Sequence, residues 1–224
     1  MADYRDTKTY VIGIKEKCVS ADVVCLSFCT TQGSFDAYAM LGRGMRHGVI
    51  MLGGEAGGVL GPGSIYTELA DTLYKRGIAS LRIDYREPGR CAPCAIDALL
   101  AVQYLDDEAV RDIALVGWSF GGAVAIGVAA LANSVRGVAA ISTVDVADCC
   151  IKQLSDKPLL LLHGESDRIS PVDVARRVHS EASGPCRLII YPGTGHELKE
   201  ARKDVLSDLN DWVCDTLRCN QVAA

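Results

Sequence analysis

Apolar residues follow two different spacings along this chain from about residue 47 onward. Short runs of almost continuous apolar residues alternate with longer stretches in which apolar residues recur every third or fourth position. The short runs are typical of buried strands, and the longer stretches are typical of helices with one apolar face. Strands are predicted over residues 47–52, 78–83, 113–116, 135–141, 158–162 and 187–191.

The helical spacing is clearest after the first of these strands. Ile65, Leu69 and Leu73 recur every fourth residue, and Lys75-Arg76-Gly77 supplies the basic last turn and the glycine that commonly end a helix. Further helices are predicted over residues 95–105, 120–131, 172–182 and 197–217. Near-continuous apolar strands separated by helices predict an α/β fold, with a mostly parallel central sheet and helices on both faces.

The first 45 residues differ from the rest of the chain. Residues 10–14 and 23–28 predict an antiparallel pair of strands at one edge of the sheet. Internal repeats, low-complexity segments and linkers are absent from the sequence, and 224 residues suit one large domain. We therefore expect residues 1–224 to form a single α/β domain.

Charge and hydrophobicity exclude several classes of partner. The chain has 23 Lys and Arg against 28 Asp and Glu, a net charge of −5, and no basic cluster to neutralise nucleic-acid phosphates. The longest apolar stretch, residues 120–132, is shorter than the 18 residues that a membrane span needs, and the N-terminus does not resemble a secretory signal. These patterns predict a soluble cytoplasmic protein that binds neither nucleic acid nor membranes; its oligomeric state is left open.

The cysteines allow two interpretations. Ten cysteines in 224 residues are below the share of about 8–10% that marks a disulfide scaffold. Cys91 and Cys94 form a C-x-x-C motif, but no second such motif and no histidine pair at zinc spacing follow. The favoured interpretation is that the cysteines are reduced and pack as small apolar side chains, so no metal site is expected. The alternative is a redox or metal-binding pair at Cys91 and Cys94.

The segment Gly117-Trp118-Ser119-Phe120-Gly121 matches the pattern G-x-S-x-G. A predicted strand enters it and a predicted helix leaves it, which is the context of a nucleophile elbow. Such a tight turn raises the serine hydroxyl above the carboxyl end of the sheet, beside the N–H groups of the helix N-terminus. The alternative is an ordinary glycine-rich helix start. We predict Ser119 as a nucleophile.

A serine nucleophile needs a general base, and the chain has four histidines. His196 follows the last predicted strand, at the same end of the sheet as Ser119, and is the predicted base. His163 ends a strand, where packing or a backbone hydrogen bond is the expected role. His47 and His179 lie in a strand and a helix and are expected to be structural.

The acid that orients the base is expected between the serine and the histidine. Asp167 follows the next-to-last predicted strand and is the first choice. Asp145, which follows the strand at 135–141, is the alternative, since some hydrolases take their acid from that position. The predicted catalytic residues are therefore Ser119, Asp167 and His196.

These motifs resemble the α/β-hydrolase superfamily over nearly the whole chain. The matching segments are 117–122, 163–167 and 193–196, in the order expected of that superfamily. The absence of a lid and the segments 52–58 and 84–89 resemble the dienelactone-hydrolase-like group within it. Members of that group proper use a cysteine nucleophile, a glutamate after the strand that precedes the first helix, and an arginine near Arg86. Ser119 in place of cysteine favours a small serine esterase related to the group.

The resemblance also implies an oxyanion hole, which needs two backbone N–H groups. One is expected from Phe120 and the other from Glu55, with Gly54 as second choice. Because a bare carboxylate would oppose the oxyanion, the Glu55 side chain is expected to be turned away or paired, with Arg86 as its predicted partner; alternatively, both are solvent-facing loop charges. Glu55, Arg86 and Trp118 are the predicted substrate-binding residues.

Only 15 residues, 143–157, connect two consecutive strands at the point where lid-bearing hydrolases insert a cap. A minimal cap or none, and an open site unlike that of a lipase, are expected. The predicted function is hydrolysis of small carboxylic esters or lactones through an acyl-enzyme on Ser119, with no cofactor. The alternatives are a thioesterase or small peptidase with the same triad, and a ligand-binding protein with little turnover. Haloalkane and epoxide hydrolases are excluded because they need a carboxylate at position 119.

Overall fold

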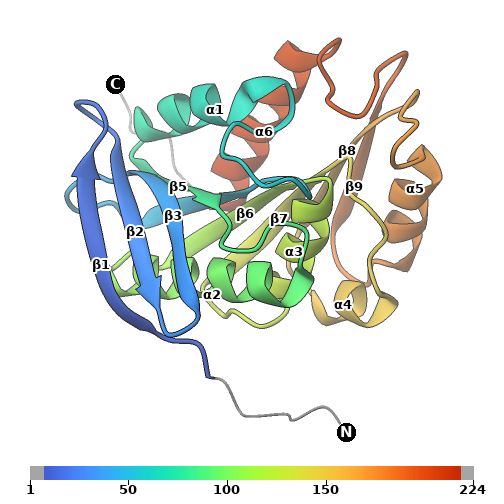
Figure 1. The fold of residues 1–224 in the computed structure, drawn as a ribbon. Coiled ribbons are helices and arrows are strands. Elements are labelled where there is room, and N and C mark those ends of the chain that lie inside the picture. Colours follow the sequence, from blue (N-terminus) through green and yellow to red (C-terminus); the bar gives the residue numbers. More distant parts are fainter. Residues whose placement is uncertain (1–7, 218–224) are drawn as a thin grey trace, which may run out of the picture.

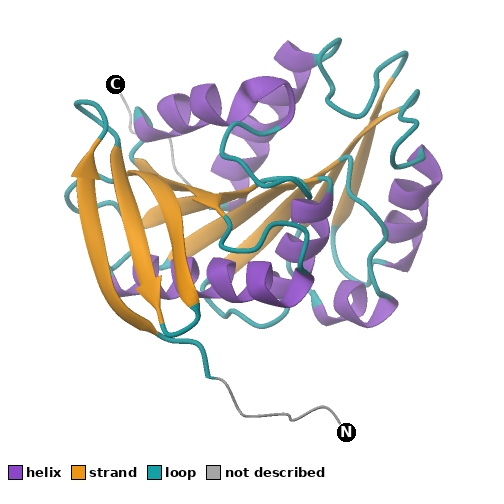
Figure 2. Cartoon of the chain, in the orientation of Figure 1, coloured by secondary structure: helices purple, strands orange, loops and turns teal. Residues whose placement is uncertain are grey.

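The computed structural model describes residues 8–217 of the chain. In this part of the chain, a nine-stranded sheet with the order β1-β2-β3-β5-β4-β6-β7-β8-β9 is covered by helices on both faces (Figures 1 and 2). The strands are β1 (Val11–Cys18), β2 (Val24–Thr30), β3 (Gly33–Met40), β4 (His47–Leu52), β5 (Ile78–Asp84), β6 (Asp112–Trp118), β7 (Val135–Ile141), β8 (Leu159–Gly164) and β9 (Cys186–Tyr191). Strands β4 to β9 are parallel to one another.

In the described part of the N-terminal region, from residue 8 onward, the strands are antiparallel, as predicted, but there are three of them instead of two. β3 pairs with β2 on one side and with β5 on the other, and so connects the antiparallel edge to the parallel strands. The sequence prediction missed β3 because two of its three buried alternate positions, Phe35, Ala37 and Ala39, are alanines. Small side chains give a weak strand pattern.

The helices divide between the two faces of the sheet. α1 (Ile65–Tyr74), preceded by a short 3-10 turn at Pro62–Ser64, packs beside α6 (Arg202–Thr216) on one face. Within residues 8–217, the other face is covered by the remaining helices (Figure 1). They are α2 (Cys91–Asp107), α3 (Phe120–Ala129), α4 (Asp148–Gln153) and α5 (Val172–Glu181). The predicted mostly parallel sheet with helices on both faces is thus confirmed.

The last helix begins later than the prediction of residue 197. Leu198 has a positive φ of 50° and a buried side chain, so the chain turns there before α6 starts at Arg202. A right-handed helix does not accommodate a leucine with this φ. Position 198 therefore belongs to the loop that carries His196, which hydrophobic spacing alone did not reveal.

The central strands are buried on both faces, which explains their continuous apolar sequence. Along β4, Val49 and Met51 pack against the α1–α6 layer, while Ile50 and Leu52 pack on the opposite side. This is the two-residue period of a strand. No helix within residues 8–217 is long and apolar enough to cross a membrane.

The turn from β6 into α3 depends on glycine at both of its ends. A β-carbon at Gly117 would lie 2.1 Å from the carbonyl oxygen of Gly121, and one at Gly121 would lie 2.3 Å from the carbonyl oxygen of Gly53. Both contacts are with backbone, which cannot swing aside as a side chain can. The first turn of α3 therefore packs directly against the end of β4.

Substitution of Gly121 by alanine is expected to destabilise the fold. The added methyl group must displace backbone, so we expect Gly121→Ala to lower the free energy of unfolding by about 3 kcal/mol. Gly127→Ala is the matched control in the same helix, because a β-carbon there meets open space in the described part of the chain. It should stabilise the protein by up to about 1 kcal/mol. Equal effects of the two substitutions in urea unfolding would contradict this packing.

Candidate active site

Ser119 lies on the turn between β6 and α3, in a strained backbone conformation with φ 55° and ψ −120°. Hydrogen bonds hold the turn on both sides: the Ser119 N–H donates to the Ile141 carbonyl at 2.8 Å, and the Gly122 N–H donates to the Ser119 carbonyl at 2.9 Å. Such strain in a non-glycine residue persists only where the surrounding structure enforces it, and it is concentrated at functional sites.

The three predicted catalytic side chains meet at the carboxyl edge of the sheet. The Nε2 atom of His196 lies 3.0 Å from Oγ of Ser119, and its Nδ1 atom lies 2.7 Å from Oδ2 of Asp167. An ionised carboxylate only accepts hydrogen bonds, so Nδ1 carries the proton of the neutral imidazole. Nε2 is then free to accept the serine proton. This is the arrangement of a nucleophile, a base and an orienting acid.

The carboxylate of Asp167 is fully buried and held by backbone donors. Its Oδ1 atom accepts hydrogen bonds from the N–H groups of Ile169, at 2.8 Å, and Ser170, at 2.9 Å. The alternative acid, Asp145, lies elsewhere: its carboxylate is 79% exposed and forms an ion pair with Arg177. The structure thus brings Asp167, and not Asp145, to the histidine.

His163 supports the loop that carries the acid. Its Nε2 atom lies 2.8 Å from the Ser170 carbonyl oxygen, which can only accept, so Nε2 is protonated. The same atom is 3.4 Å from Oδ2 of Asp167. Burial lowers the pKa of His163 below its ordinary value. It is therefore a backbone-bonded histidine whose neutral form is favoured by burial, the role that its position at the end of a strand suggested.

Trp118 contacts the histidine loop. Its indole Nε1–H donates to the His196 carbonyl at 3.3 Å, and the two rings are 5.7 Å apart. Trp118, Ile169, His196 and Lys199 also line a cavity of about 350 Å³. A larger cavity, of about 730 Å³, lies at the opposite, amino-terminal ends of the strands and is remote from Ser119. Sequence reasoning did not foresee the tryptophan–histidine contact, since the two residues are 78 positions apart.

The glycine-rich loop after β4 passes close to the serine. A β-carbon at Gly54 would lie 3.8 Å from Cβ of Ser119 and 3.3 Å from the Trp118 ring. The next residue, Glu55, has an exposed side chain. Phe120 is the first residue of α3, and the first N–H groups of a helix have no partner within the helix. Gly54 thus lies beside Ser119, and Phe120 follows the serine directly in the chain.

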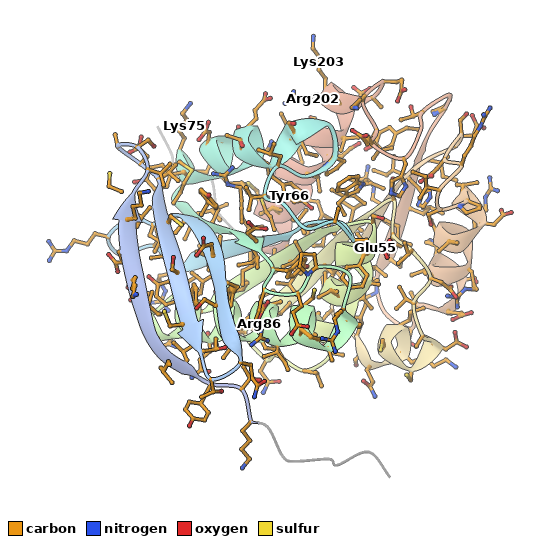
Figure 3. The ribbon with its side chains drawn as sticks, viewed as in Figure 1. Glu55, Tyr66, Lys75, Arg86, Arg202 and Lys203 are labelled. Atoms are coloured by element: carbon orange, nitrogen blue, oxygen red, sulfur yellow. The ribbon has the colours of Figure 1, made fainter. Side chains whose placement is uncertain are left out.

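The predicted pairing of Arg86 with Glu55 is wrong. The Arg86 guanidinium lies 3.1 Å from Asp97 and donates to Oγ1 of Thr30 at 3.0 Å. Its side chain is only 6% exposed, and in the part of the chain that the structure describes no ion pair joins it to Glu55. Figure 3 shows the labelled Arg86 and Glu55 side chains well apart. Arg86 pairs with Asp97 because the Asp97 carboxylate is fully buried and has little water to stabilise its charge. The helical pattern of the sequence did not predict this burial.

Asp97 also accepts a hydrogen bond from the Arg86 backbone N–H at 2.9 Å. Burial raises the pKa of Asp97 to about 6, and the Arg86 N–H and guanidinium limit the rise. At neutral pH the pair is therefore ionised. Through Thr30 and Asp97, Arg86 connects the antiparallel strands to α2. Its side chain is buried and does not line the cavity beside His196.

Residues 8–217 contain no group of three or more His, Cys, Asp or Glu side chains placed to bind a metal ion.

Comparison with known families identifies the chain: a model of the dienelactone hydrolase family matches residues 64–212. The chain belongs to the dienelactone hydrolase family. The resemblance inferred from the sequence motifs is confirmed, and a hydrolase is indicated.

Solved structures of other hydrolases share this fold. The dienelactone hydrolase of Anabaena variabilis superposes with a TM-score of 0.75 over 92% of this chain and 99% of that one, at 20% identity. Est1E from Butyrivibrio proteoclasticus gives a TM-score of 0.73 over 92% of this chain and 99% of its own, at 16% identity. At such identities the likeness establishes the fold alone.

Curated relatives match over shorter segments. An uncharacterized protein of Mycobacterium tuberculosis is 30% identical over 169 residues, which are 62% of this chain and 60% of that protein. The chain thus matches about three fifths of the length of this relative. A monoacylglycerol lipase of Mycolicibacterium smegmatis is 40% identical over 63 residues, 27% of this chain and 22% of the lipase.

The ion pair of Arg86 and Asp97 makes a pH-dependent contribution to stability. Arg86→Met leaves a buried carboxylate unpaired, so at pH 8 it should lower the free energy of unfolding by about 3–5 kcal/mol. At pH 5 the cost should shrink, because Asp97 is then largely neutral in both proteins. The control, Arg86→Met combined with Asp97→Leu, should recover much of the loss at pH 8. A cost that is the same at both pH values and in the double variant would disprove this role.

Proposed function

We propose that this protein is a serine hydrolase that cleaves small carboxylic esters or lactones through an acyl-enzyme on Ser119. The observation that supports it most directly is the hydrogen-bonded series Asp167–His196–Ser119, with its 2.7 Å and 3.0 Å links. The strained serine turn and the membership of a hydrolase family point the same way.

In the proposed acylation step, Oγ of Ser119 attacks the carbonyl carbon of the ester while Nε2 of His196 takes the hydroxyl proton. The buried carboxylate of Asp167 stabilises the imidazolium and keeps its ring oriented. The imidazolium then donates its proton to the leaving alcohol oxygen. In the second half of the reaction, His196 activates a water molecule that cleaves the acyl-enzyme.

The proposed oxyanion donors are the backbone N–H groups of Phe120 and Glu55. Phe120 begins α3, so its N–H shares the positive end of the helix dipole. The 54–55 backbone is favoured for the second donor because Gly54 lies so close to Ser119. Since the Glu55 side chain is exposed, water screens its charge, and no arginine partner is needed to protect the oxyanion.

The proposed substrates are small because little of the chain encloses the site. The connection between β7 and β8, which lies wholly within the described residues, contains only the short helix α4, so that no cap covers Ser119 from there. The cavity beside His196 has about 350 Å³, and Ile169 at its margin is 73% exposed. We infer that Trp118 both forms a wall of this cavity and, through its bond to the His196 carbonyl, positions the base.

Ser119→Ala is expected to abolish ester hydrolysis and leave the fold intact, because only a small oxygen at the end of a turn is removed. Activity should be measured with 4-nitrophenyl acetate and folding by circular dichroism. A folded variant with a tenth or more of the wild-type kcat would remove Ser119 from the mechanism.

Asp167→Asn and Asp145→Asn form a matched pair of substitutions. Asp167→Asn should lower kcat by about 10²–10⁴, because the imidazole loses its orientation and the support for its positive charge. Asp145→Asn breaks only an exposed ion pair with Arg177 and should leave kcat near the wild-type value. If the loss is larger in Asp145→Asn, the acid has been assigned to the wrong strand.

Acyl-chain length tests the proposed substrate size. Across 4-nitrophenyl esters, kcat/KM should peak between acetate and butyrate and then fall, since an open site buries few added methylenes and each is worth only about 0.8 kcal/mol. The Ser119→Ala protein corrects for background hydrolysis. A kcat/KM that rises steadily to dodecanoate would instead indicate an extended acyl-binding groove.

A further inference from the structure

Two cysteines stand in the first turn of α2. Cys91 is the first residue of this helix and is exposed, whereas Cys94 is buried. The thiol of Cys94 donates a hydrogen bond to the Glu87 carbonyl at 3.2 Å. The hydrolytic mechanism proposed above uses neither residue.

The helix brings the two cysteines within reach of each other. Residues three apart in an α-helix lie on the same face with Cα atoms about 5 Å apart, inside the range of about 4.4–6.8 Å that a disulfide spans. The preceding residue, Arg90, has extended backbone angles (φ −102°, ψ 110°), so Cys91 has helical neighbours only on its C-terminal side. Its side chain can therefore turn toward Cys94 with adjustment of one end of the helix.

We propose that Cys91 and Cys94 form a reversible dithiol–disulfide site, which small-molecule disulfides oxidise, and that its state adjusts the loop carrying Gly54 and Glu55. The first part is independent of the hydrolase chemistry. The second part rests on the proposed function, because it concerns the rate of ester hydrolysis.

The exchange proceeds in two steps. The exposed Cys91, as its thiolate, attacks one sulfur of the small disulfide and releases the other sulfur as a thiolate, which leaves a mixed disulfide on Cys91. Cys94, after losing its proton to solvent, attacks Cys91 Sγ and releases the second small thiolate. Two electrons pass from the dithiol to the small molecule, and the two released thiolates take up the two protons.

The surroundings of Cys94 fit this order of attack. Burial raises the pKa of the Cys94 thiol to about 11, and the nearby Asp97 carboxylate adds to the rise. Cys94 therefore stays protonated and hydrogen-bonded to Glu87 in the reduced protein. The solvent-exposed Cys91 is the sulfur that an external disulfide meets first.

The segment between β5 and α2 connects this site to the candidate oxyanion loop. Oδ1 of Asp84 accepts the Gly58 N–H at 3.3 Å, and a β-carbon at Gly57 would lie 2.9 Å from Pro88. Gly89 packs against the Glu55 backbone, since a β-carbon at Gly89 would lie 3.3 Å from the Glu55 carbonyl oxygen.

The bond that oxidation removes lies in this same segment. Once Cys94 is in a disulfide, it has no thiol proton to donate to Glu87, so the segment loses a contact that fixes it to α2. We expect the 54–58 loop to shift with it. A backbone donor that moves away from the oxyanion lowers kcat, and complete loss of one such donor costs about 10²–10³.

A second pair of cysteines could compete for the same partner. Cys149 and Cys150 lie at the start of α4. Burial raises the pKa of the Cys150 thiol, with smaller contributions from Cys149 and then from Cys91. Cys91 is thus near enough to Cys150 to affect it electrostatically, and the experiment must separate the two possible disulfides.

Trypsin separates them cleanly. Cleavage after Arg90 and Arg111 gives one peptide, residues 91–111, that contains Cys91 and Cys94 and no other cysteine. Cleavage after Arg136 and Lys152 gives another, residues 137–152, that contains Cys149 and Cys150. An internal disulfide leaves peptide 91–111 two hydrogens lighter, while a bond from Cys91 to Cys150 joins the two peptides.

The full-length protein is equilibrated in buffers with increasing ratios of oxidised to reduced glutathione. Its free thiols are then alkylated, and the masses of its tryptic peptides are measured by mass spectrometry. We expect peptide 91–111 to gain the internal disulfide as the ratio rises and to lose it on reduction, and Cys91→Ser to prevent it. Three results would overturn the site: two alkylated cysteines at every ratio, a stable glutathione adduct without the internal bond, or the cross-link to peptide 137–152.

Hydrolysis of 4-nitrophenyl acetate tests the link to the oxyanion loop. Oxidised wild-type protein should have a kcat roughly tenfold lower than reduced protein, restored by reductant. Cys91→Ser should keep the reduced activity in both buffers. Equal activity of the oxidised and reduced wild type, or inhibition that persists in Cys91→Ser, would overturn the link. Reduced protein with no esterase activity would count against the proposed function, while the peptide masses still decide the disulfide.

Discussion

The contact between the first turn of α3 and the end of β4 is the constraint on which the site depends. Gly121 lies against the backbone of Leu52 and Gly53 with no space for a β-carbon, and this contact holds Ser119 in its strained conformation. The same contact brings Gly54 beside the serine. Because β4, β6, β8 and β9 are parallel, their carboxyl ends share one edge, and the loops carrying Asp167 and His196 converge there on Ser119.

Two buried carboxylates, those of Asp97 and Asp167, are held by backbone donors as well as by a side-chain partner. Asp167 accepts two N–H groups besides the His196 ring, and Asp97 accepts the Arg86 N–H besides facing its guanidinium. These bonds compensate each carboxylate for the water that it loses on burial. The segment between β5 and α2 packs against the loop next to Ser119 through Pro88 and Gly89, and Glu87 in the same segment accepts the Cys94 thiol.

Local patterns in the sequence predicted most of the fold and the three side chains that meet at the site. The strand–turn–helix context of Ser119 and the chain order of Asp167 and His196 are readable without tertiary information, because parallel strands bring successive loops to one edge. Contacts between distant residues were not readable. One such contact is the ion pair between Arg86 and the buried Asp97, and another is the hydrogen bond from Trp118 to the His196 carbonyl. Both depend on how helices and loops pack together, which hydrophobic spacing does not predict.

The most direct test of the account is the site of covalent labelling by a fluorophosphonate, which reacts with an activated serine. The tryptic peptide of residues 112–136 contains Ser119 and one other serine, Ser134, so fragmentation assigns the adduct. The account predicts one adduct per chain, on Ser119, which forms far more slowly when His196 is replaced by alanine. An adduct on another residue, or no adduct on a folded protein that hydrolyses esters, would contradict the proposed acyl-enzyme.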